Sequence, residues 1–166
     1  AEESVRLTGN VRVTSKNHDL KEKAMSLAGN ISDYSKKKEP LSSVNNVKNV
    51  VGQIKFNSVI YNSDKSRQGF GYGIEEDSIN ILKLKEQVYD GKLFSFDAKD
   101  EALVGRDIAE NLNLKVGDEI TLLGKGLNDS YKSKYKVVGF CDVGNTLLNK
   151  AFFVSLTSAQ DLLEMP

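Results

Sequence analysis

Residues 104–122 read VGRDIAENLNLKVGDEITL, and this stretch decides the expected fold. It combines the end of a strand, an amphipathic helix over 107–112, a tight turn at Gly117-Asp118 and an alternating strand over 119–123. Its apolar side chains recur at spacings that place them together against a neighbouring sheet. These side chains are Ile108, Leu112, Leu114, Ile120 and Leu122. The stretch predicts a helix and a sheet that share one core.

Short strand-like and helix-like segments surround this stretch. Strands are expected over 9–15, 50–61, 68–74, 102–104, 131–140 and 151–155, where β-branched and aromatic residues gather or alternate. Helices are expected from Pro40, over 75–89 with Gly91 as the end, and over 158–164 with Thr157 as the cap. This mixture predicts an α+β fold, in which a strand-helix-strand part precedes a compact set of short strands with helices.

The composition indicates an ordered globule. A chain of 166 residues is long enough for one domain or for two small lobes that share a core. With 39% hydrophobic residues and only two prolines, it has the means to bury a core. Lys plus Arg and Asp plus Glu number 23 each, so no net charge attracts a polyanion, which argues against nucleic acid as a partner.

The single cysteine, Cys141, excludes an internal disulfide and is expected to be a small buried apolar residue. The sequence has no run of about 18 apolar residues that could span a bilayer, and no signal sequence at its start. The chain as given is therefore expected to be soluble. Any transmembrane segments would flank it in the full gene product.

The sequence assigns no catalytic, cofactor-binding or metal-binding residue. His18 is the only histidine and lies in a polar segment, so neither a catalytic triad nor a zinc site is indicated. The GFGYG stretch at 69–73 lacks the helix of a nucleotide fingerprint, and its glycines are interpreted as relieving crowding in a curved strand. The GKG stretch at 124–126 lacks the ending of a Walker loop.

Two groups of side chains are candidate partner contacts. Lys132 and Lys134, with Lys136, share one face of the expected strand, and Lys125 precedes them. They would meet an anionic partner or lipid headgroups, or simply keep the sheet soluble. Leu93 and Phe94, with Phe96, form an apolar cluster that is either a contact surface or packed under a neighbouring loop.

The motifs, taken in order, resemble one family. They are GNVRV at 9–13, VVGQI at 50–54, GIEE at 73–76, YDGKL at 89–93, residues 104–112, Gly117-Asp118, VVGF at 137–140 and FVSLTSAQ at 153–160. This order is similar to the MacB-like periplasmic core domain of bacterial ABC-transporter permeases, the FtsX-like group that includes the permeases that release lipoproteins. Each motif alone is short and degenerate, and the resemblance rests on their order from about Gly9 to the end.

The resemblance implies two lobes. A porter-like α/β lobe would begin with residues 1–68, a small barrel-and-helix lobe would be inserted over 69–156, and 157–166 would return to the first lobe. The family continues for several more elements, so the porter-like lobe here is expected to be incomplete. The domain would lie in the periplasm, at the outer face of the inner membrane.

The resemblance also implies a non-catalytic role. A separate cytoplasmic ATPase would bind and hydrolyse ATP, and the permease would carry the resulting motion to this domain for export or lipoprotein release. Expected partners are a second permease copy or a related permease, that ATPase, and a periplasmic adaptor or lipoprotein carrier. In lipoprotein-releasing members an extended hairpin grips the carrier. Here the equivalent connection, 124–130, is short and lacks the family's proline, which argues against that grip.

Two other classes of function stay open on the residues alone. One is a freestanding extracytoplasmic module that binds a ligand or a protein through its lysine face or its Phe-rich segment. The other is a hydrolytic enzyme, which is disfavoured because His18 is the only imidazole.

Overall fold

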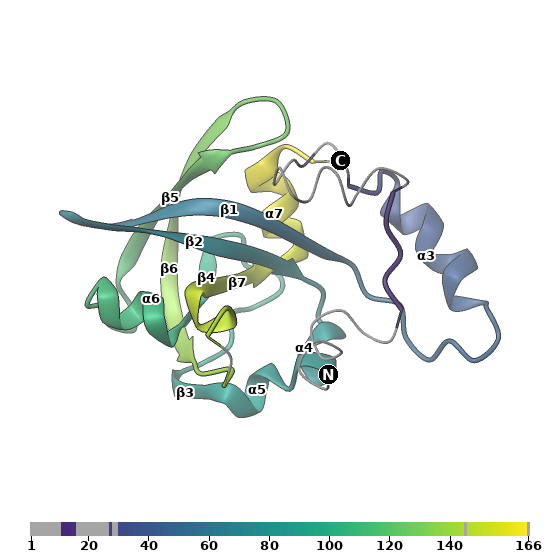
Figure 1. The fold of residues 1–166 in the computed structure, drawn as a ribbon, viewed down its shortest axis with the longest axis horizontal. Coiled ribbons are helices and arrows are strands. Elements are labelled where there is room, and N and C mark those ends of the chain that lie inside the picture. The colour runs from purple at the N-terminus through teal and green to yellow at the C-terminus, as the bar shows by residue number, and fades with distance from the viewer. Residues whose placement is uncertain (1–10, 16–26, 28–29, 145, 166) are drawn as a thin grey trace.

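A computed structural model describes residues 11–15, 27, 30–144 and 146–165 (Figure 1). The helices are α3 (Tyr34–Ser42), α4 (Ser78–Leu82), α5 (Leu84–Gln87), α6 (Arg106–Asn111), the 3-10 helix η2 (Leu148–Lys150) and α7 (Leu156–Leu163). The strands are β1 (Gln53–Asn62), β2 (Lys65–Ile74), β3 (Val88–Gly91), β4 (Glu101–Gly105), β5 (Glu119–Lys125), β6 (Ser130–Cys141) and β7 (Ala151–Ser155).

These strands form a closed barrel with one strand attached outside it. The order is β6-β4-β7-β2-β1-β5, and β5 pairs back with β6 to close the ring, while β3 lies beyond it on β6. The length of β6 makes this closure possible, because its first half pairs with β5 and its second half with β4 and β3. The seam between β1 and β5 is short and centres on the pair Ile60 and Leu122.

The barrel interior is packed with side chains that alternate along the strands. This inner core includes Ile54, Phe56, Ile60, Ala102, Val104, Ile108, Leu112, Ile120, Leu122, Tyr131, Tyr135, Val137, Phe152, Val154, Ala159 and Leu163. Alternate residues of β2 that face the interior are glycines. A Cβ at Gly71 would stand 2.2 Å from the Phe56 ring, and one at Gly73 would stand 2.3 Å from Ala159 Cβ. The predicted relief of crowding is thus confirmed, and it admits α7 into the barrel.

A second core lies on the outer side of the same strands. This outer core comprises Tyr72, Ile74, Leu82, Leu84, Phe94, Leu103, Val138, Cys141, Leu148, Ala151 and Phe153. The segment that carries α4, α5 and β3 runs beneath the barrel in Figure 1 and covers it. Cys141 is fully buried there, as the sequence predicts, and this burial raises the pKa of its thiol to about 12. Both faces of β4 and β7 are therefore covered.

The polar groups of α7 are tied into the barrel. Tyr135 Oη lies 2.7 Å from Ser158 Oγ, which itself donates to the Lys99 carbonyl at 2.7 Å, so the tyrosine hydroxyl is the donor to the serine. At the start of α7, Ser155 Oγ accepts the Ser158 amide at 3.1 Å. The expected cap, Thr157, is therefore wrong: Ser155 holds the N-cap position, and the helix begins two residues earlier than predicted.

The opening stretch folds largely as predicted. Gly105 ends β4 and precedes α6, whose Ile108 is fully buried in the inner core. Gly117 has a φ of 99°, and its amide donates to the Val137 carbonyl at 2.7 Å, so the turn joins β6 before β5 begins. The helix, turn and strand share one core, as expected from residues 104–122 alone.

The expected helix over 75–89 is wrong. The chain forms two short helices, α4 and α5, because Lys83 between them adopts a left-handed conformation with a φ of 51°. From Val88 onward it is β3, and Gly91 ends that strand rather than a helix. A Cβ on Gly91 would stand 2.3 Å from the Val138 carbonyl, so glycine permits this close approach to β6.

Two expectations near the N-terminus also differ from the structure. Residues 9 and 10 lie outside the described residues, and 11–15 are not a strand; Val11 is 81% exposed and Val13 is 52% exposed. Pro40 does not begin a helix. It lies inside α3, near its end, and no residue of that helix is buried.

The structure confirms the α+β class and matches the expected two-lobe description, with α3 set apart from a barrel-and-helix body (Figure 1). The predicted boundary between residues 68 and 69 falls inside β2, which pairs with β1 from Asn62 to Gln53. The division into 1–68, 69–156 and 157–166 stays a prediction. Within the described residues, no helix has both the length and the apolar character needed to cross a membrane.

Candidate functional site

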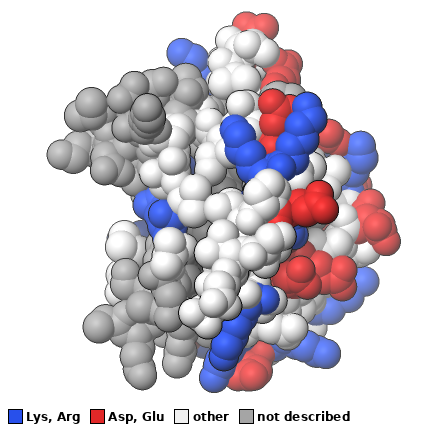
Figure 2. Space-filling view, turned by 90° about the vertical axis from the view of Figure 1, so that its right-hand side faces the viewer, with Lys and Arg blue, Asp and Glu red and all other residues white. Residues whose placement is uncertain are grey.

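A cleft of about 530 Å³ lies where α3, the end of β2 and the start of α7 meet. Tyr34 and Lys38 of α3, Glu75 after β2, and Thr157 and Gln160 of α7 are among its lining residues. Figure 2 views the molecule from the side on which α3 lies, and it shows lysine, arginine and carboxylate side chains interspersed rather than gathered by sign. The cleft is polar and open to solvent.

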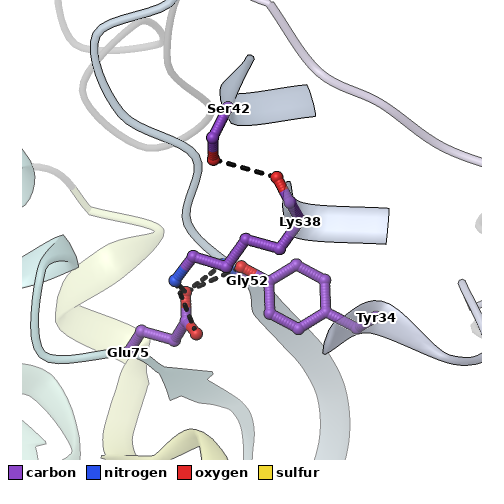
Figure 3. A network of polar contacts seen from close by, with 5 residues as sticks. All are labelled: Tyr34, Lys38, Ser42, Gly52 and Glu75. Carbon is purple, nitrogen blue, oxygen red and sulfur yellow. Dashed lines mark hydrogen bonds and ion pairs between the residues drawn. The ribbon is translucent and has the colours of Figure 1, made fainter. Parts of the chain in front are cut away.

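The carboxylate of Glu75 is the centre of this site (Figure 3). Its Oε2 accepts the Tyr34 hydroxyl at 2.8 Å and the Gly52 amide at 2.7 Å. Lys38 Nζ reaches both carboxylate oxygens, at 3.1 Å and 3.0 Å. One side chain thus joins three segments: α3, the residue before β1, and the end of β2.

Local sequence explains how these groups meet. Ile74 is fully buried at the end of β2, which fixes the position at which Glu75 leaves the strand. Tyr34 and Lys38 are four residues apart and therefore lie on the same side of α3. Gly52 has no side chain, and a Cβ there would stand 2.8 Å from the Tyr34 ring, so glycine lets the ring lie over the backbone.

The site is held by charge as well as by hydrogen bonds. Burial and the bond to the Glu75 carboxylate raise the pKa of Tyr34, which keeps its hydroxyl protonated as a donor. Lys38 Nζ also lies 5.8 Å from the centre of the Tyr34 ring. The side chains of Lys38 and Glu75 are 33% and 22% exposed, so water reaches the pair.

The contacts at this site hold separate segments of the chain together. Glu75 is occupied by three donors, and none of the residues in Figure 3 is an imidazole or a thiol that would form a nucleophile–base pair. Among the described residues, no cluster of three His, Cys, Asp or Glu side chains is arranged to hold a metal ion. His18, the only histidine, lies outside the described residues.

A second polar network closes the far end of β6. Arg106 Nη1 lies 2.9 Å from Asp142 Oδ2, and the guanidinium carbon lies 4.9 Å from the centre of the Tyr89 ring. Asp142 Oδ1 accepts from Asn149 Nδ2 and from the Gly144 amide, each at 3.0 Å. The bond from Asn149, then that from Gly144, and the charge of Arg106 lower the pKa of Asp142.

The lysines predicted as partner contacts lie on the outer surface of the β5–β6 hairpin. Lys132 and Lys134 are exposed and alternate with buried tyrosines, as the expected strand required. Lys134 Nζ forms an ion pair with Glu119 at 2.6 Å, and Lys125 is exposed at the end of β5. The structure does not bring these lysines to the cleft, and their role as contacts stays a prediction.

The apolar candidates lie in or against the outer core. Phe94 is 4% exposed, and Leu93 and Phe96 are half-buried against that core. The rings of Phe94 and Phe96 lie 5.0 Å apart between centroids. The alternative to a contact surface is packing under a neighbouring loop; Phe94 is packed, but against the outer core of the barrel. Contact of these residues with a partner stays a prediction.

Sequence reasoning did not predict that the residues around Glu75 meet in one cleft. In the sequence, the acidic run at 75–77 favours the start of a helix, with acid/base chemistry as the disfavoured alternative, and Tyr34 and Lys38 lie in a stretch of mixed pattern. Lys38 and Gly52 are separated from Glu75 by 37 and 23 residues in the chain. No spacing rule within one element connects residues that far apart, so only the fold brings them together.

The family model of the MacB-like periplasmic core domain matches residues 2–165. No curated protein sequence matches the chain at a significant level.

Two solved structures share the fold. The extracellular domain of the noncanonical ABC-type transporter YknZ from Gram-positive bacteria is 16% identical, with a TM-score of 0.60 over 79% of this chain and 65% of that one. The periplasmic region of MacB from Actinobacillus actinomycetemcomitans is 13% identical, with a TM-score of 0.58 over 80% of this chain and 59% of that one. The chain thus spans less than two thirds of either domain's length. Because the family model covers nearly every residue, the chain belongs to the MacB-like periplasmic core domain family.

Proposed function

We propose that this chain is the extracytoplasmic domain of an ABC-type permease and that it transmits ATP-driven motion without making or breaking bonds itself. The observation that carries the proposal is the family match over residues 2–165. The packing supports it, because a closed barrel with a filled interior and a covered outer side resists deformation and moves as one body. A body of this kind passes on displacement rather than absorbing it.

ATP would be bound by a separate cytoplasmic ATPase, and a second permease copy or a related permease would complete the transporter. Export and lipoprotein release are both uses of such motion, with a periplasmic adaptor or a lipoprotein carrier as the partner. The β5–β6 hairpin has a short loop whose Leu127 amide donates to the Leu163 carbonyl at 2.9 Å. Because this loop is bonded to the end of α7, it supports a model in which the whole domain moves. It argues against a model in which a free hairpin grips a carrier.

The parent gene gives the first test. We expect hydropathy to show one membrane span before this domain and three after it, with an ATPase gene nearby. A neighbouring adaptor or outer-membrane channel gene would favour export. A gene that encodes no membrane span would contradict the proposal and favour a freestanding binding module.

Reconstitution gives the second test. In proteoliposomes that hold the parent permease and its ATPase, a parent that lacks this domain should still hydrolyse ATP but should no longer move substrate. The matched control keeps the domain and replaces Lys65, an exposed residue next to the β1–β2 turn, with glutamine. Transport that persists without the domain would contradict a transmitting role.

A further inference from the structure

Residues 31–51 leave the barrel body and return to it, and none of their side chains is fully buried. Every residue in this range is half-buried or exposed. The segment is anchored on both sides, because Leu27 is 9% exposed in the inner core and Gly52 is buried before β1. In Figure 1, α3 stands to the right of the barrel strands rather than against them. We call residues 31–51 the flap.

The flap is fastened to the body by polar contacts at Glu75. Tyr34 and Lys38 both donate to this carboxylate, which also accepts the Gly52 amide (Figure 3). Water already reaches the Lys38–Glu75 pair, so separation replaces these bonds with bonds to water. Barrel strands differ in this respect, since separating them would expose fully buried side chains such as Ile60 and Leu122.

The helix within the flap has little stability of its own. It has nine residues, contains Pro40 and lacks a side-chain hydrogen bond at its N-cap. Isolated helices of this length are marginal in water, and a proline in the helix removes a backbone donor. Its helical structure therefore depends on contact with the body.

We propose that residues 31–51 form a movable flap that opens and closes about its two anchors, with Glu75 as the latch, while the barrel stays folded. Opening separates Tyr34 and Lys38 from Glu75 and removes the α3 wall of the cleft. The proposed movement of the flap needs only this chain and does not depend on the transporter. Its use as the joint where permease motion enters the barrel rests on the proposed function.

Hydrogen exchange of the intact chain tests the latch. Glu75→Gln removes the charge that holds Lys38 and Tyr34, so peptides that cover α3 should exchange faster by about tenfold, the loss expected for a bond to a charged group. The double variant Tyr34→Phe with Lys38→Met removes the partners without touching β2, and should give a similar increase. The matched control, Lys99→Gln, breaks the exposed Lys99–Asp161 pair and should leave α3 unchanged.

A distance measurement distinguishes movement of the flap away from the barrel from unfolding of α3 without such movement. Spin labels on Glu39→Cys in α3 and Lys65→Cys beside the β1–β2 turn should report a wider distance distribution in Glu75→Gln than with Glu75 intact. Cys141 is fully buried and should stay unlabelled. Unchanged exchange of α3, faster exchange of β1 and β2 by the same factor as α3, or an unchanged distance distribution would each overturn the flap. None of these measurements uses the transporter, so their failure leaves the proposed function standing.

Discussion

At single positions in this domain, the close approach of neighbouring backbones and rings limits which residue types fit. The GFGYG stretch could have been a phosphate loop on composition alone, but the structure places its glycines in a strand against the barrel interior. At Gly71 the Phe56 ring occupies the space of a side chain. That ring is itself held by edge contacts to Tyr131 and Phe152, with centroids 6.3 and 5.7 Å away, so it has little room to withdraw.

Gly71→Ala should therefore destabilise the domain. A Cβ would stand 2.2 Å from the Phe56 ring, and overpacking of this kind lowers the free energy of unfolding by about 1–3 kcal/mol. Urea denaturation followed by circular dichroism measures the change. Ser66→Ala, at an exposed position on the same strand, is the control and should change stability little. Equal stability of Gly71→Ala and the unmodified chain would mean that the interior is less tightly filled than the structure shows.

The lowered pKa of Asp142 predicts how the stability of the domain depends on pH. Its bonds to Asn149 and Gly144 and the charge of Arg106 hold its folded-state pKa below the unfolded value. Its contribution to the free energy of unfolding is therefore present above about pH 4 and is lost as the pH falls through the folded-state pKa. The stability difference between the unmodified chain and Asp142→Asn should be greatest near neutral pH and should shrink below about pH 4.

Denaturation curves at several pH values measure this difference. Asp64→Asn, at the exposed β1–β2 turn, is a control for the loss of one carboxylate. A difference for Asp142→Asn that stays constant from neutral to acid pH would show that the ionised side chain does not stabilise the fold.

Elements differ in how well the sequence predicts them. Alternation and β-branched residues mark most of the strands directly, as the Tyr131 and Tyr135 pattern of β6 does, whereas β3 begins in a segment whose spacing predicts a helix. Helices were placed less well. The break at Lys83 depends on a left-handed backbone that its residue type does not signal, and α3 contains a proline that the pattern assigned to a helix start. The cleft was missed because its residues belong to separate elements.

The start of α7 provides a direct contrast between two neighbouring hydroxyls. Ser155 accepts the Ser158 amide, whereas Thr157 lies inside the helix. Ser155→Ala should lower the free energy of unfolding by about 1 kcal/mol, the usual effect of losing an N-cap, while Thr157→Ala should be nearly neutral. Thermal or urea denaturation of both variants measures the difference. A larger loss for Thr157→Ala would restore the cap that the sequence first suggested.

At the scale of the whole molecule, two cores share one set of strands. Leu103 and Val104 are neighbours in β4, and both are fully buried, but Leu103 faces the outer core and Val104 the inner core. Strand β4 therefore contributes buried side chains to both cores. The barrel and the segment around α4 and α5 are therefore expected to unfold together, and the flap, which shares neither core, is the part that can separate first.

Paired substitutions in β4 test this cooperativity. Leu103→Ala should lower the free energy of unfolding by about 2–5 kcal/mol and Val104→Ala by about 2 kcal/mol, from lost burial and the cavity left behind. In both variants, hydrogen exchange should accelerate by similar factors in peptides lining the inner core and in peptides lining the outer core, because each loss falls on the same global unfolding step. Val116→Ala, at a position 41% exposed, serves as the control. If Leu103→Ala accelerated exchange only around the outer core, the two cores would be separate cooperative units, and motion applied to one side of the barrel would not be carried rigidly to the other.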